Sequence, residues 1–126
     1  MEPMHSPLRL HCPSPSQAIE QLQVHFARHN RFKPVADDVF FALIEAIGNA
    51  IEHTAAPYTV SVTANKKRVT IDITDFGGGF ILEAPAMPSP LAEHGRGIPI
   101  IQSLVDFVEY KKSRRGNRLR LRKNLR

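Results

Sequence analysis

The sequence predicts an α+β fold, a two-layer α/β sandwich with helices on one face of a mostly antiparallel sheet. Two observations predict it. Short segments in which apolar and polar residues alternate occur near both ends and in the middle of the 126-residue chain. Between them lie segments whose apolar residues recur every three or four positions, which is the period of a helix. The resulting order is strand, helix, helix, two strands, loop, helix, two strands.

The N-terminal part predicts an edge strand and a first helix. Residues Leu8 to Cys12 alternate weakly and give the strand. The helix runs from Ser14 to about Asn30, with Ser14 as its N-cap, Pro15 in its first turn and Gln17 placed for a capping box. Val24 falls outside the predicted apolar face, which consists of Ile19, Leu22 and Phe26.

The clearest helix is the segment ADDVFFALIEAIGNAIEHT, residues 36–54. Asp37 and Asp38 lie near its start, where the helix dipole favours negative charge. Helical spacing predicts one apolar stripe, made of Phe40, Leu43, Ile44, Ile47 and Ile51. The same spacing places a polar stripe on another face, made of Glu45, Asn49, Glu52 and His53.

The C-terminal part predicts four strands, a loop and a helix. Residues 58–64 and 68–74 alternate and form an antiparallel hairpin. Residues 81–94 carry three prolines and little periodicity, which predicts a long loop with the character of a lid. A helix begins near Ile98 with Pro99 in its first turn. The last two strands, about 107–112 and 118–123, are separated by a turn at Gly116 and Asn117.

Positive charge is concentrated at the C-terminus. Residues 111–126 hold nine of the 17 Lys and Arg residues and no acid, whereas residues 1–110 hold eight against 12 acids. Leu119 and Leu121 alternate with arginines, and no aromatic residue lies among these bases. The pattern favours a half-buried strand with a solvated basic face over a nucleic-acid site, which would also use stacking aromatics.

The chain is expected to form one cytoplasmic domain over residues 1–126. Its single cysteine, Cys12, excludes an internal disulfide and favours a reducing compartment. The N-terminus lacks the continuous apolar stretch of a secretory signal. The sequence also has no run of about 18 apolar residues, which a membrane span would require.

Three short motifs follow one another along the chain. They are Glu45-x-x-x-Asn49 on a helix, Asp75-x-Gly77-x-Gly79 after a strand, and Gly95-x-Gly97 before a helix. Each is common by itself, as a solvated helix face, a strand-ending turn or a helix cap. Together, their order and spacing resemble the N, G1 and G2 boxes of the GHKL superfamily, which includes DNA gyrase, histidine kinases and mismatch-repair ATPases. The resemblance covers roughly residues 8–124. The compact size and the run from Glu93 to Ile98 most resemble the anti-sigma factor serine/threonine-protein kinases.

The resemblance implies that ATP and Mg²⁺ are the cofactors. It makes Glu45 the catalytic base, Asn49 a Mg²⁺ ligand and Asp75 the acceptor for the exocyclic amine of adenine. The loop over residues 81–94 would be the lid that closes over ATP. The nucleotide-binding positions carried over from the family are Asn49, Asp75, Gly77, Gly79, Gly95, Arg96, Gly97, Ile98 and Asn117.

Three positions depart from the family pattern. Asn117 stands where members usually carry Thr, whose hydroxyl joins the adenine-binding network; Asn can both donate and accept a hydrogen bond. Gly48 replaces the usual Ala or Thr inside the helix, which lowers helix propensity by about 1 kcal/mol or leaves room for a close approach. Pro99 replaces a large apolar residue after the G2 box.

The function implied by the resemblance is a protein kinase that phosphorylates an anti-sigma-factor antagonist on serine. In the related proteins the same molecule sequesters a sigma factor, and partner switching links the two activities. The alternative is a non-catalytic regulatory module whose affinity for a partner depends on bound nucleotide. The related kinases commonly form homodimers, and the sequence leaves the oligomeric state of this chain open.

Overall fold

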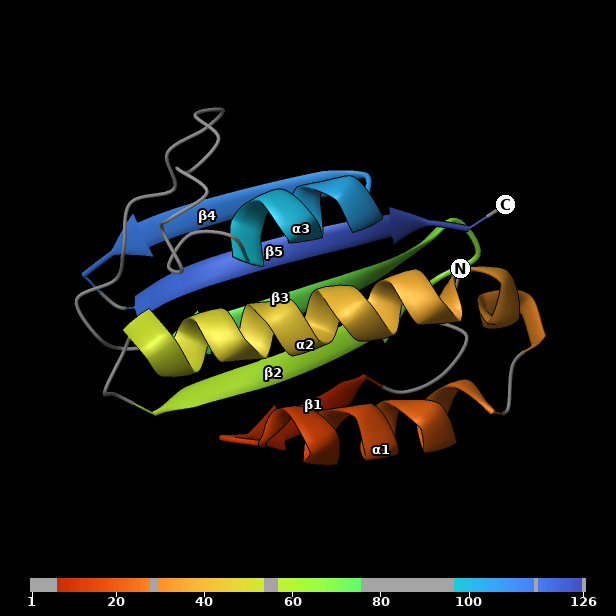
Figure 1. Ribbon diagram of the computed structural model, residues 1–126, viewed down its shortest axis with the longest axis horizontal. Helices are drawn as coiled ribbons and strands as arrows, with labels where there is room; N and C mark the ends of the chain where they lie inside the picture. The colour runs from red at the N-terminus through yellow and green to blue at the C-terminus, as the bar shows by residue number, and fades with distance from the viewer. Residues whose placement is uncertain (1–6, 28–29, 54–56, 76–96, 115, 126) are drawn as a thin grey trace.

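The structure is a computed structural model that describes residues 7–27, 30–53, 57–75, 97–114 and 116–125. It confirms the predicted α+β class: helices lie on one face of a five-stranded sheet in which every pairing is antiparallel (Figure 1). The strand order across the sheet is β1-β2-β3-β5-β4. The elements are β1 (Leu8–His11), α1 (Pro15–Phe26), the 3₁₀ helix η1 (Asn30–Val35), α2 (Ala36–His53), β2 (Tyr58–Ala64), β3 (Arg68–Asp75), α3 (Gly97–Leu104), β4 (Phe107–Ser113) and β5 (Gly116–Asn124).

Two tight turns fix the register of the sheet. In the turn between β2 and β3, the Asn65 side chain accepts hydrogen bonds from the backbone N–H groups of Lys67 and Arg68 at 2.7 and 3.0 Å. At the start of β5, Gly116 has a φ of 141°, a conformation that side chains disfavour. The β2–β3 hairpin agrees with the predicted strands. The turn predicted at Gly116 and Asn117 is wrong, because these residues continue the antiparallel pairing: Gly116 lies opposite Ser113 and Asn117 opposite Lys112, so both belong to β5.

Helix α1 begins as the sequence predicts and ends earlier. The Ser14 hydroxyl accepts from the Gln17 backbone N–H at 3.2 Å, and the Gln17 side chain accepts from the Ser14 N–H at 2.9 Å, which completes the capping box. The helix ends at Phe26, and the next described element is η1, which was not predicted. Phe32 of η1 is fully buried and stacks on Phe26 with ring centroids 4.6 Å apart. This aromatic stack holds the short segment in place.

The predicted apolar stripe of α2 is wrong in part, because the buried face is rotated relative to it. Leu43 and Ile47 are fully buried, as predicted, but Ile44 and Ile51 are exposed. The remaining buried apolar positions are small or β-branched, which lets the helix approach the sheet closely; they are Val39, Ala42, Ala46 and Ala50. The polar stripe is also divided, because Asn49 is buried whereas Glu52 is exposed.

The core lies between the helix layer and one face of the sheet. The inward side chains of β2, β3 and β5 alternate with outward ones, and the inward set includes Val60, Val62, Ile71, Ile73, Leu119 and Leu121. Lys123 joins the layers: its ammonium donates to the Leu104 carbonyl at 2.8 Å and lies 3.0 Å from the Asp38 carboxylate. This cation stabilises the C-terminus of α3 and pairs with an acid in the first turn of α2.

The opposite face of the sheet carries the arginines of the C-terminal strand. Arg120 binds Asp72 through two hydrogen bonds of 2.7 and 2.9 Å, and Arg118 pairs with Glu109 at 3.2 Å. The Arg122 guanidinium lies 4.9 Å from the ring centroid of Phe107. The predicted alternation of leucine inside and arginine outside is therefore confirmed. In the part of the chain that is described, no helix has the length and apolar character needed to cross a membrane.

Candidate functional site

The site begins with Asp75, the last residue of β3. Alternation from Ile71 and Ile73 places its side chain on the face covered by helices, where it is only 6% exposed. Antiparallel pairing places Asn117 of β5 directly opposite, at 1% exposure. The Asn117 side-chain amide donates a hydrogen bond of 2.9 Å to Oδ1 of Asp75. Two polar residues thus continue the buried row that apolar residues form along the rest of both strands.

The contact with Asn117 fixes the rotation of the Asp75 carboxylate. A carboxylate that is taken out of water is stable only where hydrogen-bond donors replace the lost hydration. The amide of Asn117 supplies one such donor, and both side chains make further contacts. A fixed carboxylate at this depth can accept a hydrogen bond from a ligand with little loss of side-chain entropy.

Helix α2 contributes Glu45 and Asn49, which lie one turn apart. Asn49 is 7% exposed, and its side-chain Nδ2 has no hydrogen-bond partner among the described residues. An unpaired buried donor destabilises a protein by about 1–3 kcal/mol, so a ligand that supplies an acceptor is favoured at this position. Glu45 is half-buried and therefore remains accessible to a second reactant.

The N-terminus of α3 completes the described part of the site. Gly97 is the first residue of this helix, and Pro99 lies in its first turn, as predicted. Helix α3 packs against α2, and in Figure 1 the two helices cross the same face of the sheet near β3 and β5. The first turn of a helix presents unpaired backbone N–H groups and a positive dipole end, which attract anions.

Some predicted site residues lie outside the described residues. These are Gly77, Gly79, Gly95 and Arg96, together with the predicted lid at 81–94; Ile98 is described only as part of the α3 backbone. Of the remaining predicted positions, the structure brings Asp75 and Asn117 into direct contact and places Glu45 and Asn49 on one helix. Within the described residues, no three His, Cys, Asp or Glu side chains group together to hold a metal ion.

The comparison with protein families decides the assignment. The model of the histidine kinase-like ATPase domain matches residues 14–123. The chain belongs to this family. The matched range includes every described site residue, from Glu45 and Asn49 on α2 to Asp75 and Asn117 in the sheet. Family membership confirms the GHKL resemblance predicted from the three motifs.

Comparison with solved structures supports the same fold for this histidine kinase-like ATPase domain. The chain is similar to the crystal structure of the RsbU and RsbW domains of Rv1364c from Mycobacterium tuberculosis, with a TM-score of 0.70 and 18% sequence identity. The alignment covers 96% of this chain and 33% of that one, so the chain spans about one third of its length. At this identity the likeness shows the fold alone. The comparison with curated proteins gave no match.

The contact between Asn117 and Asp75 was not predicted. Asn117 was predicted as a nucleotide-binding position that departs from the usual Thr, and in the structure it is the hydrogen-bond partner of Asp75. The register between β3 and β5 is the signal that identifies the pair, because it aligns Ile73 with Leu119 and then Asp75 with Asn117. That register joins residues 42 positions apart, so periodicity within one segment does not reveal it.

Proposed function

We propose that this histidine kinase-like ATPase domain binds ATP with Mg²⁺ and is a cytoplasmic serine/threonine-protein kinase that acts as an anti-sigma factor. Its substrate would be an anti-sigma-factor antagonist, and its second partner a sigma factor, in a partner-switching system. The proposal that the domain binds a nucleotide rests on the buried Asp75 carboxylate, which Asn117 holds in place. A buried carboxylate at the end of a core strand contributes little to packing and suits recognition of a polar ligand.

Asp75 would select adenine over guanine. Its carboxylate can accept a hydrogen bond from the exocyclic amine of adenine, whereas guanine places a carbonyl oxygen at the corresponding position. Two oxygen atoms that both carry negative charge density repel each other, and the buried carboxylate would lose its hydration without compensation. Gly77 and Gly79 would allow the backbone to approach the base closely, because neither has a Cβ.

Asn49 fits a site for Mg²⁺ and phosphate. Its amide oxygen is a hard ligand of the kind that Mg²⁺ prefers, and its unpaired Nδ2 donor could bind a phosphate oxygen. When bound, ATP supplies the phosphoryl group, and Mg²⁺ supplies part of the charge compensation that phosphoryl transfer requires. Gly95, Arg96, Gly97 and Ile98 would present backbone N–H groups at the start of α3 to the phosphates.

Glu45 would act as the base in phosphoryl transfer. It lies one helical turn before Asn49, so a serine hydroxyl held near the phosphates could pass its proton to this carboxylate. The serine oxygen would gain the phosphoryl group and ADP would leave. The segment 81–94 would close over the phosphates and exclude water, which otherwise competes with serine.

The anti-sigma assignment is supported by the run from Glu93 to Ile98, which resembles that of the anti-sigma factor kinases. A phosphotransfer assay with labelled ATP, Mg²⁺ and a candidate antagonist tests it. We expect label on a serine of the antagonist, and we expect Glu45→Gln to bind ATP normally while it transfers phosphate at least about 100-fold more slowly. Antagonist that stays unlabelled, with partner affinity still set by ATP, would instead establish the non-catalytic regulatory module.

A further inference from the structure

Helix α2 presents a stripe of apolar residues to solvent. Phe41, Ile44 and Ile51 are 58%, 36% and 52% exposed. Together with Gly48 they are spaced three, four and three residues apart, so they lie along one side of the helix. We call Phe41, Ile44, Gly48 and Ile51 the outer stripe. Single exposed apolar residues are ordinary, but an aligned row of them along a helix is typical of a docking surface.

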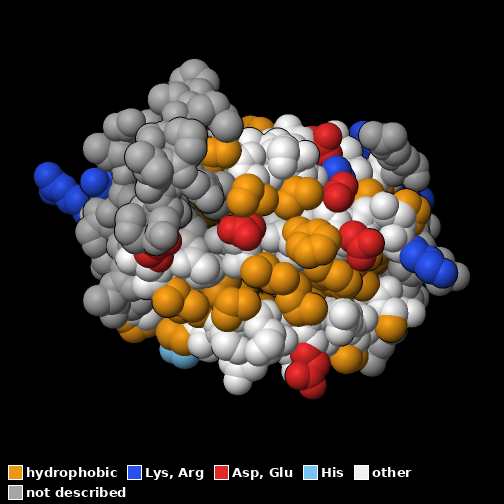
Figure 2. Space-filling model, viewed as in Figure 1, with side chains coloured by type: hydrophobic (Ala, Val, Ile, Leu, Met, Phe, Trp, Pro, Cys, Tyr) orange, Lys and Arg blue, Asp and Glu red, His pale blue; other side chains and the backbone are white. Residues whose placement is uncertain are grey.

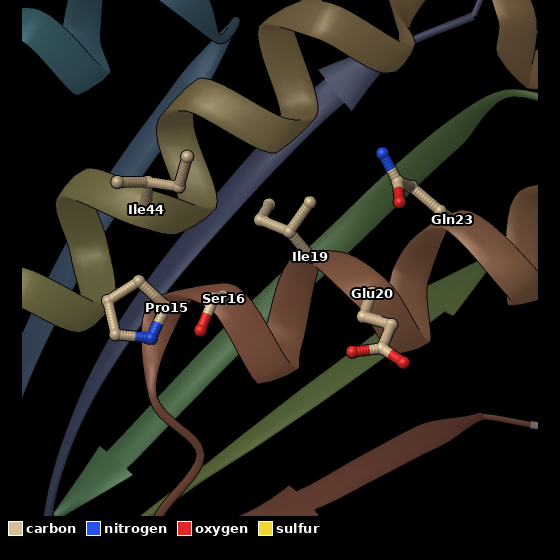
Figure 3. A pocket seen from close by; sticks show the side chains of 6 residues that line it. All are labelled: Pro15, Ser16, Ile19, Glu20, Gln23 and Ile44. Atoms are coloured by element: carbon tan, nitrogen blue, oxygen red, sulfur yellow. The ribbon is translucent and has the colours of Figure 1, made fainter.

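A groove adjoins the outer stripe on the side of α1. It has a volume of about 580 Å³ and opens to solvent between the two helices. Figure 3 shows the Ile19 side chain extending from α1 toward α2, and Ile44 on the neighbouring part of α2. Its lining is mostly apolar and consists of Pro15, Ser16, Ile19, Glu20, Gln23 and Ile44. The groove therefore offers space for one or two apolar side chains of a partner next to the outer stripe.

Gly48 leaves a gap in the outer stripe. A Cβ built at this position would meet no atom within 4 Å in the part of the chain that is described, so no packing there requires glycine. Glycine nevertheless lowers helix propensity by about 1 kcal/mol relative to alanine. A glycine on an exposed helix side lets another backbone approach more closely than a larger residue would.

Acidic residues border this surface. Helices α1 and α2 together contain five Asp and Glu residues and neither Lys nor Arg; the acids are Glu20, Asp37, Asp38, Glu45 and Glu52, of which Asp38 pairs with Lys123 of β5. In Figure 2 the apolar side chains form a band over the helix layer with acidic side chains along it, and Lys and Arg lie mainly at the edges of the view. The arginines of β5 project from the other face of the sheet. Helices α1 and α2 are thus negative on a chain whose formal net charge is +5.

We propose that the outer stripe and the adjoining groove bind an amphipathic helix of a partner protein, with apolar residues at helical spacing flanked by Lys and Arg. The apolar face would pack on Phe41, Ile44 and Ile51 and pass over Gly48, as in helix-in-groove recognition. Its basic flanks would face Glu20 on α1 and the acids of α2. A second copy of this chain fits poorly, because a symmetric contact through this face would oppose acid to acid.

The outer stripe is separate from the buried polar pair of the candidate site, and of the proposed site residues only Glu45 lies at its border. It involves neither Asp75 nor Asn117, and Phe41, Ile44 and Ile51 lie on a different side of α2 from the buried Asn49. The test can therefore be made without ATP, and its result is separate from that of the proposed kinase activity.

The experiment is a titration of the ¹⁵N-labelled chain with two synthetic peptides of about 18 residues, long enough to form a helix on binding. One is an amphipathic helix of Leu and Lys, and the other has Glu in place of every Lys. We expect the Leu/Lys peptide to shift the amide signals of residues 19–23 and 41–51. Its binding should weaken as the salt concentration rises. The Leu/Glu peptide should bind at least about tenfold more weakly, because the surface repels it.

Matched variants locate the contact. Ile51→Lys and Val24→Lys introduce the same charge at apolar positions of similar exposure, 52% and 59%, but Val24 lies outside the outer stripe and the groove. We expect Ile51→Lys and Glu20→Lys each to lower the affinity for the Leu/Lys peptide at least about threefold. Val24→Lys should change this affinity less than twofold. Equal binding of both peptides, shifts confined to the sheet face, equal effects of Ile51→Lys and Val24→Lys, or self-association that masks the stripe would each overturn the proposal.

Discussion

Asn117 donates a 2.9 Å hydrogen bond to the Asp75 carboxylate from the directly opposite position on the neighbouring strand. Both residues are at least nine-tenths buried, so neither side chain is stabilised by full hydration. The pair occupies the position where the apolar rows of β3 and β5 would otherwise continue. A polar pair of this kind stabilises the fold only while both members are present, since removal of one leaves the other unsatisfied.

The first prediction concerns that pair. Asn117→Ala should lower the free energy of unfolding by about 1–3 kcal/mol, because the buried carboxylate loses a donor. It should also weaken ATP binding, since the carboxylate is no longer held in one orientation. Urea denaturation and calorimetry measure the two effects. Asn117→Thr keeps a hydroxyl donor and should retain most of both; if the Thr variant behaves like the Ala variant, donation to Asp75 is not the function of Asn117.

The second prediction concerns Gly48. Gly48→Ala should raise the free energy of unfolding by about 0.5–1 kcal/mol, because alanine favours the helix and its Cβ meets no neighbouring atom. Thermal and urea denaturation of the two proteins check this. Lower stability of the alanine variant would show that something packs against the glycine in the folded chain.

The third prediction concerns Tyr58, whose hydroxyl donates to the backbone carbonyl of Pro13. Burial, and to a lesser degree the nearby Cys12, raises the pKa of this phenol. The folded state therefore holds the phenol proton more tightly than the unfolded state, in which tyrosine titrates at about pH 10. The resulting stability is complete below that pH and is lost as pH rises through the raised pKa of the folded state.

Tyr58→Phe should accordingly lower the free energy of unfolding by about 0.5–1.5 kcal/mol at pH 7, because the hydrogen bond to Pro13 is removed. The difference in free energy of unfolding between wild type and variant should become smaller in alkaline solution, where only the wild type loses stability through this phenol. Urea denaturation across the pH range measures the gap. A gap that widens with pH would contradict the assigned direction of the pKa shift.

The fourth prediction concerns the open face of the sheet. Arg120 binds Asp72 through two parallel hydrogen bonds, and this raises the pKa of the Arg120 guanidinium. Arg120→Lys keeps the charge but loses the two-point geometry, so it should lower the free energy of unfolding by about 0.5–1.5 kcal/mol. Arg118→Lys is the matched control, because Arg118 has a single contact of 3.2 Å with Glu109. Denaturation that finds the control equally destabilised would contradict a special contribution from the paired contact.

Much of the fold could be predicted because it depends on local chemistry. The capping box at Ser14, the turn at Asn65 and the alternation of Leu119 and Leu121 are all encoded within a few residues. Features that depend on contacts between distant segments were missed. The buried face of α2 is set by how closely small residues let it approach the sheet, and η1 is held by Phe32 stacking on Phe26.

The candidate site divides in the same way. The spacing of Glu45 and Asn49 and the position of Asp75 after a strand are visible in the sequence. The structure places Glu45 and Asn49 on the predicted helix and makes Asp75 the last residue of the strand, one residue beyond the predicted end. The contact between Asp75 and Asn117 is not visible, since it requires the register of two strands that are not consecutive in the chain. The lack of a partner for Asn49 Nδ2 among the described residues is likewise a consequence of tertiary burial.

Calorimetric titration of the purified chain with ATP and with GTP, each with and without Mg²⁺, tests the central claim most directly. We expect ATP to bind and GTP not to bind, Asp75→Asn to abolish binding because its amide removes the charged acceptor, and Asn49→Ala to remove the dependence on Mg²⁺. Far-UV circular dichroism of each variant confirms that it is folded. If the wild-type chain binds no adenine nucleotide, or binds GTP as well as ATP, the account of Asp75 and Asn117 as an adenine-selective pair is wrong.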